Sequence, residues 1–110
     1  MKEWITLKQH STQLSAATAL VQLLQEHPNL AAAEWSISSV IPSLRGFVFG
    51  GDMAALAAYA DVLGGSIRAS KNTHEDQGQR VRSHRLTTVW RDVPVEIVVA
   101  LPVPVAAVAS

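Results

Sequence analysis

Residues 47–70, FVFGGDMAALAAYADVLGGSIRAS, decide the fold, because two glycine pairs divide this stretch into a strand, a helix and a second strand. Asp52 follows the first pair and is a favourable helix N-cap. Gly64 begins the second pair and suits the left-handed position that ends many helices. Short strand–helix–strand connections usually place their strands parallel, through a right-handed crossover. The expected buried stripe of this helix is Met53, Leu56, Ala57, Ala60 and Leu63.

The segment before this unit predicts another helix, from about Thr12 to His27. Pro28 ends this helix, because proline cannot continue it. The apolar residues among positions 4–7 fit either a short strand or a hydrophobic lead-in, and we leave both open. Apolar residues at helical spacing form the expected buried stripe: Leu14, Ala17, Leu20, Val21 and Leu24.

Alternation of apolar and polar residues predicts the remaining strands. Arg91 and Asp92 lie between two long strands and predict a tight hairpin. Residues 71–79 have no apolar side chain and predict a solvated loop. The expected strands are residues 34–40, 47–49, 66–70, 80–90 and 93–101, with the first two forming an antiparallel hairpin.

The element order α-β-β-α-β-β-β predicts an α+β fold. Each expected helix has one apolar stripe, so we expect both helices on one face of a mixed, mostly antiparallel sheet of about five strands. The chain of 110 residues fits a single domain, residues 1–110. Residues 102–110 are apolar and contain two prolines, and they fit either a loose tail or a segment that lies on a partner.

This order resembles a group of small uncharacterised domains in bacteria and their phages. Two features carry the resemblance: the capped, alanine-rich helix from Asp52 to Gly64, and the final hairpin with Trp90-Arg91-Asp92-Val93-Pro94-Val95. The resemblance spans roughly residues 12–101. Because these motifs are turns and core positions, the resemblance implies a fold and no activity.

Composition excludes several classes of function. The chain contains no cysteine, so disulfides, zinc–thiolate sites and a thiol nucleophile are absent from it. The formal net charge is zero, whereas general nucleic-acid binders are usually basic. Charged residues make up only 16% of the chain, which favours self-association. Residues 1–10 do not have the pattern of a secretory signal, and no apolar run is long enough to span a membrane, so we expect a cytoplasmic protein without a membrane partner.

Three patterns invite a chemical role, and each has a simpler interpretation. Residues 50–52 could cradle a phosphate at a helix N-terminus, but no P-loop lysine follows and Asp52 would repel an anion. Residues 74–76 could ligate a metal, but adjacent residues rarely converge on one ion. Ser83 and His84 are neighbours on a strand, so their side chains point to opposite faces and cannot pair as nucleophile and base. We therefore assign no catalytic residue, metal ligand or cofactor, and expect no enzyme.

Basic residues cluster between positions 68 and 85 and could contact nucleic-acid phosphates from the sheet. The alternative is an exposed sheet face kept soluble by arginine, with Glu96 as a cross-strand partner. The candidate nucleic-acid contacts are Arg68, Lys71, Arg80, Arg82 and Arg85.

The long C-terminal strand predicts an edge that needs cover, for which a homodimer or another protein partner is a solution. A non-enzymatic interaction domain is therefore our first hypothesis, and a nucleic-acid-binding module is the second. A small-ligand binder or enzyme, with a pocket between helices and sheet, is the third. The candidate dimer contacts are Trp90, Val95, Ile97, Val99 and Leu101.

Overall fold

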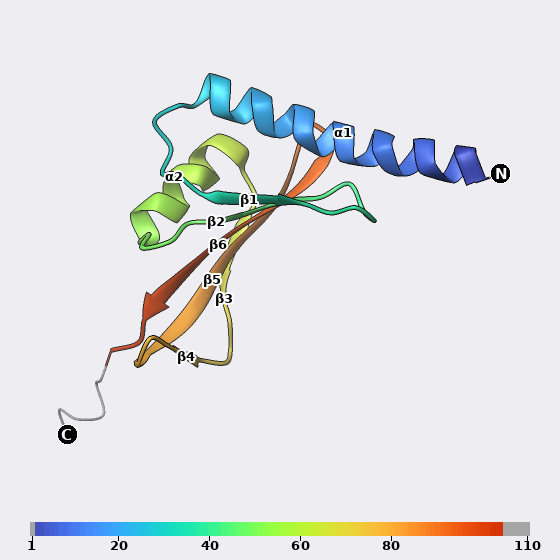
Figure 1. Cartoon of the computed structure of the whole chain (residues 1–110). Helices are drawn as coiled ribbons and strands as arrows, with labels where there is room; N and C mark the ends of the chain where they lie inside the picture. The colour runs from blue at the N-terminus through green and yellow to red at the C-terminus, as the bar shows by residue number, and fades with distance from the viewer. Residues whose placement is uncertain (1, 105–110) are drawn as a thin grey trace.

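A computed structural model describes residues 2–104, and the side chains of residues 13–104 (Figure 1). It has the predicted α+β class and order, with one additional short strand within the expected loop. Residues 105–110 of the expected tail lie outside the described part. The elements are α1 Lys2–Glu26, β1 Glu34–Ile37, β2 Leu44–Phe47, α2 Met53–Leu63, β3 Ser66–Ala69, β4 His74–Asp76, β5 Gln79–Trp90 and β6 Val93–Pro102.

One mixed sheet contains all the strands, in the order β1-β2-β6-β5-β3, with β4 paired to β5 beside β3. Only the pairing of β2 with β6 is parallel among those described. Strands β2 and β3, which flank α2 in the chain, are parallel as predicted, because both run antiparallel to β5. They are not neighbours, since β6 and β5 lie between them.

Two tight hairpins join the C-terminal strands. Arg91 and Asp92 have φ of 52° and 65°, so two left-handed residues make the predicted turn between β5 and β6. Gln77 and Gly78, with φ of 51° and 79°, make a similar turn between β4 and β5. Strand β4 was not predicted because its three side chains are all exposed and have no apolar periodicity.

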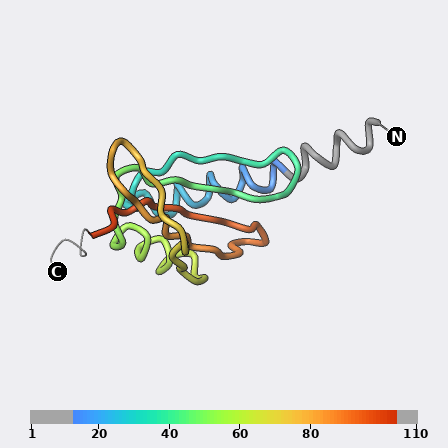
Figure 2. Tube along the Cα trace, turned by 90° about the horizontal axis from the view of Figure 1, so that it is seen from below, coloured from blue at the N-terminus to red at the C-terminus, as the bar shows by residue number. Residues whose placement is uncertain are grey.

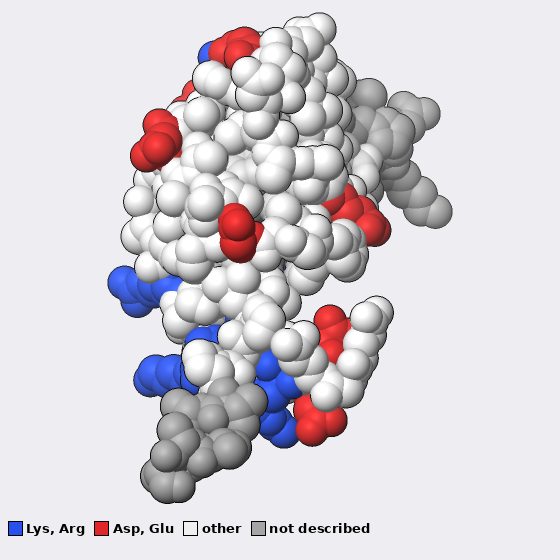
Figure 3. All heavy atoms as spheres, turned by 90° about the vertical axis from the view of Figure 1, so that its left-hand side faces the viewer, with Lys and Arg blue, Asp and Glu red and all other residues white. Residues whose placement is uncertain are grey.

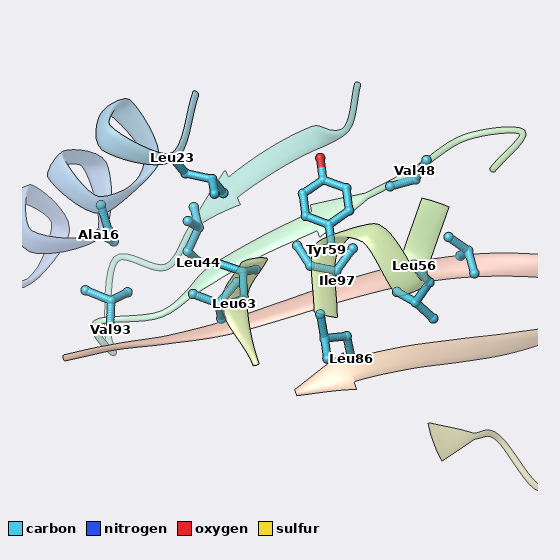
Figure 4. Packing of buried hydrophobic residues seen from close by; sticks show 13 residues of the cluster. Ala16, Leu23, Leu44, Val48, Leu56, Tyr59, Leu63, Leu86, Val93 and Ile97 are labelled. Atoms are coloured by element: carbon cyan, nitrogen blue, oxygen red, sulfur yellow. The ribbon is translucent and has the colours of Figure 1, made fainter. Parts of the chain in front are cut away.

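The core lies between both helices and one face of the sheet (Figure 4). Alternate residues of β6 supply its centre, from Val93 to Val99, and Leu86 of β5 lies opposite Ile97. Tyr59 of α2 is buried, and its hydroxyl donates to the carbonyl oxygen of Ala31 at 2.5 Å. Burial raises the pKa of Tyr59 above its ordinary value.

The prediction for the buried face of α1 is wrong for most of its residues, although Leu20 packs partly buried against the core as predicted. Leu14, Val21 and Leu24 are 66%, 51% and 52% exposed. The face packed on the sheet contains Ala16, Ala19 and Leu23 instead. Two small side chains there let the helix lie close to the strands, so the bulkier stripe faces outward. Figure 1 shows α1 along the β1–β2 hairpin and extending past it toward the N-terminus, and the coloured part of α1 in Figure 2 also lies beside this hairpin.

The limits of α2 are the predicted ones. The Asp52 side chain accepts a hydrogen bond from the Ala55 amide at 2.9 Å, and Gly64 has φ of 74° at the C-terminal cap. Leu56, Tyr59 and Leu63 are its buried residues. Met53 is 41% exposed and Ala57 is exposed, so only part of the expected stripe of α2 is buried.

The expectation that the last strand lies at an edge is also wrong. Strand β6 lies between β2 and β5, so both of its edges are paired. Val95, Ile97 and Val99 are at most 2% exposed and face the core of their own chain. The edges of the sheet are β1 and, on the other side, β3 and β4.

Candidate functional surfaces

The sheet face opposite the core is uncovered by either helix, and we call it the open face. Strand register shows which side chains share this face, because directly opposed residues point to the same side. One row across the strands contains Arg45, Glu96, Thr87 and Ser66, and the next contains Phe47, Val98, Arg85 and Arg68.

Glu96 is shared by two arginines on the open face. Its Oε1 lies 2.7 Å from Nη2 of Arg45, and its Oε2 lies 3.5 Å from Nε of Arg85. The sequence-based suggestion of Glu96 as a cross-strand partner for an arginine agrees with this contact. Arg45 was not predicted, because its part of the chain was expected to be a turn before a strand at residues 47–49, whereas β2 begins at Leu44.

Arg68 and Arg85 oppose each other directly across β3 and β5. Among the described residues, Arg68 has no hydrogen-bond or ion-pair partner. A hollow of about 270 Å³ lies at this pair, lined by Arg68, Ala69, Ser70, Ser83, Arg85 and Thr87.

The other predicted basic contacts do not join this pair. Arg82 faces the helix side of the sheet, where its Nη1 donates to the carbonyl oxygens of Ser70 at 2.6 Å and Lys71 at 3.1 Å. Arg80 donates to the Thr73 hydroxyl at 3.0 Å and lies 3.4 Å from Glu75. The predicted strip is therefore divided between two faces, and Lys71 lies in the exposed turn after β3. Figure 3 shows several basic side chains in its lower half, with acidic ones beside them, and mostly acidic side chains among the charges above them.

Two aromatic rings add to the open face. Phe47 lies in register with Val98, and its ring centroid is 4.5 Å from that of Phe49. Phe49 is 68% exposed. The sequence predicts only that these residues belong to a strand. Their spacing of two was the signal that places both rings on one side.

The outward face of α1 is apolar along much of its described length. We call Leu14, Ala17, Val21 and Leu24 the outer stripe. Its three large members are more than half exposed, as given above. Glu26 and Gln22, on another side of the helix, both accept hydrogen bonds from Arg91.

The predicted dimer contacts now have definite places. The three buried β6 residues face the core and are not available to a partner. Trp90 is half-buried against the core, with the Arg91 guanidinium 4.2 Å from its ring centroid. Leu101 is also half-buried at the edge of the core.

The other patterns singled out in the sequence do not form chemical sites in the described part of the chain. Asp52 already uses its oxygen for the helix cap. Ser83 and His84 pair with consecutive residues of β6 and point to opposite faces. Among the residues whose side chains are described, no three His, Asp or Glu side chains are placed so that they could hold one metal ion. A hollow of about 440 Å³ lies between the β1–β2 loop and β6, where Arg45 and Glu96 are paired with each other.

No helix within the described residues is long and apolar enough to cross a membrane. A scan of protein-family models, a search of curated proteins and a search of solved structures each found no match to this chain.

Proposed function

We propose that this protein is a non-enzymatic domain that acts through self-association, as a homodimer in which the outer stripe of α1 packs on the same stripe of a second copy. The exposure of Leu14, Val21 and Leu24 carries this proposal. Large apolar side chains that lie together on a helix and face water favour burial against a partner.

The spacing of the outer stripe supports a second helix as the partner. Its members are separated by three, four and three residues, which is the spacing of the a and d positions in coiled coils. In a two-fold antiparallel contact, Leu14 would oppose Leu24 and Ala17 would oppose Val21. Such a contact is self-complementary, as a two-fold interface requires.

The residues beside the outer stripe also suit a copy of the same helix. Gln13, Thr18 and Gln25 flank it and are uncharged, so association brings no like charges together there. Glu26 is already paired with Arg91, so association does not place an unpaired carboxylate at the contact. A low fraction of charged residues, 16%, fits a surface that is covered in the working state.

Light scattering coupled to size exclusion tests this proposal. We expect a dimer at micromolar concentration for the wild-type chain, and a monomer for Leu24→Glu and Val21→Glu, because a buried carboxylate at the contact is unfavourable. Both substitutions place a good helix former on an exposed position, so the fold should persist by circular dichroism.

Val89→Glu is the matched control. Val89 is 65% exposed but lies on the open face, so its replacement should leave the dimer intact. A wild-type monomer over the micromolar range would overturn the proposal. A dimer that survives both helix substitutions would also overturn it and direct attention to the sheet edges.

A further inference from the structure

The directly opposed arginines of β3 and β5 carry an inference beyond self-association. Arg68 and Arg85 are exposed on the same face, where like charges in register destabilise the strand pair. Of the two arginines, only Arg85 has a carboxylate partner among the described residues, Glu96, and Arg45 holds the other oxygen of that carboxylate. This face therefore has three guanidinium groups near a single carboxylate, and a bound anion would offset the excess positive charge.

The hollow at this pair has the donors that an anion needs. Ser70, Ser83 and Thr87 contribute hydroxyl groups beside the two guanidinium groups. No carboxylate lines the hollow. Its volume of about 270 Å³ is on the order of nine water molecules, at about 30 Å³ each. Guanidinium groups bind phosphate through paired hydrogen bonds, so a phosphate group fits this chemistry best.

Aromatic side chains lie in the same row of the sheet as the two arginines. Phe47, Val98, Arg85 and Arg68 follow one another across four neighbouring strands. Neighbouring strands are about 4.8 Å apart, so Phe47 lies about 10 Å from Arg85 along this row. The adjacent ring of Phe49 is 68% exposed. Aromatic rings beside basic groups are the arrangement with which proteins hold single-stranded nucleic acid, since bases stack and phosphates pair.

We propose that the open face binds single-stranded nucleic acid, with a backbone phosphate in the hollow between Arg68 and Arg85 and a base stacked on Phe49. Glu96 borders the hollow through its contact with Arg85, and the other carboxylates on this face lie away from it. Glu34 is on the far edge strand, β1, and Asp76 is on β4. A nucleic-acid strand that crosses the sheet along this row, from β2 to β3, contacts the aromatic rings first and the arginine pair second.

Fluorescence anisotropy with labelled single-stranded oligothymidine and oligouridine, at low salt and over a salt series, tests the proposal. We expect Arg68→Gln to weaken binding and to reduce the slope of log K against log salt by about 0.7, the value for one phosphate contact on a single strand. Phe49→Ala should weaken binding at least about five-fold, because one stacked base is lost.

Arg80→Gln is the control for charge. It removes the same positive charge from an exposed position on β5, but Arg80 lies on the other face and is paired with Glu75. Its effect should be small. Equal losses for Arg80→Gln and Arg68→Gln would overturn a localised site, as would a failure of the wild type to bind either oligonucleotide at low salt.

Inorganic phosphate is the probe that separates the two sources of a phosphate group. We expect it to compete only weakly with the oligonucleotide. Phosphate that binds as tightly as the oligonucleotide, together with a Phe49→Ala variant of unchanged affinity, would overturn the nucleic-acid assignment and leave a site for a small phosphorylated ligand. Thermal unfolding of each variant shows whether the fold is intact.

Discussion

Arg91 and Glu26 join the β5–β6 turn to the last turn of α1 through a two-pronged ion pair. Nη1 of Arg91 lies 2.6 Å from Oε2 of Glu26, and Nη2 lies 2.5 Å from Oε1. The hydrogen bond from Arg91 lowers the pKa of Glu26 below its ordinary value of 4.5. The guanidinium also lies over Trp90, so one side chain connects the helix, the turn and the edge of the core.

This ion pair predicts how stability depends on pH. Because the folded pKa of Glu26 is depressed, its stabilising effect is present above pH 4.5 and is lost as the pH falls through the folded pKa. The melting temperature of Glu26→Gln should lie below that of the wild type at neutral pH, and the two should converge in acid. Melting curves at several pH values measure this difference. A gap that stays constant down to acid pH would contradict the assignment.

Gly46 lies directly beneath the Trp35 ring on the neighbouring strand. A Cβ atom at residue 46 would be 2.7 Å from Cζ3 of Trp35, closer than atoms can pack. Gly46→Ala should therefore destabilise the fold by about 1–3 kcal/mol in denaturant unfolding. In the background of Trp35→Leu the same substitution should cost much less, because the ring is gone. Additive effects of the two substitutions would show that the ring does not limit the space at residue 46.

The cap of α2 supplies a third test. Asp52→Ala removes the acceptor for the Ala55 amide and should cost about 1 kcal/mol of unfolding free energy. Asp52→Asn keeps a capping oxygen and should be close to the wild type. Chemical denaturation of the three proteins decides this, and an equal loss in both variants would assign the effect to charge and not to capping.

Much of the fold could be predicted because turn chemistry and strand alternation are local. Asp52 and Gly64 mark the ends of α2, and the alternation of β6 identifies its core face. The orientation of α1 could not be predicted, because its sequence has two apolar faces. The choice between them depends on how closely Ala16 and Ala19 approach the sheet. The central place of β6 depends on its pairing with β2, a contact between distant parts of the chain.

The candidate nucleic-acid surface could be predicted only in part. The sequence places Arg68, Arg80, Arg82 and Arg85 close together, and alternation along one strand puts Arg85 on the opposite face from Arg80 and Arg82. Whether Arg68 shares the face of Arg85 depends on the register of β3 against β5. A shift of one residue reverses the face of every side chain in a strand. Arg45 and Phe47 reach the same face through the pairing of β2 with β6, which no local pattern indicates, and the ring of Phe49 lies against that of Phe47.

Arg68 and Arg82 differ in what they do for the fold, and this provides the last test. Arg68 opposes Arg85 without a partner among the described residues, so Arg68→Thr should raise stability by about 0.2–1 kcal/mol. Arg82→Thr should lower stability by about 1 kcal/mol, because Arg82 holds two carbonyl oxygens in the turn after β3.

The salt dependence of stability tests the same two substitutions, Arg68→Thr and Arg82→Thr, independently. Repulsion between exposed charges is screened as ionic strength rises, so salt should reduce the advantage of Arg68→Thr over the wild type. The deficit of Arg82→Thr should change less, because that side chain donates hydrogen bonds at 2.6 Å and 3.1 Å to carbonyl oxygens. Melting curves at low and high salt measure both effects. If Arg68→Thr instead destabilised the protein at low salt, the arginine pair would itself stabilise the fold. The inference that Arg68 is available to bind an anion would then lose its basis.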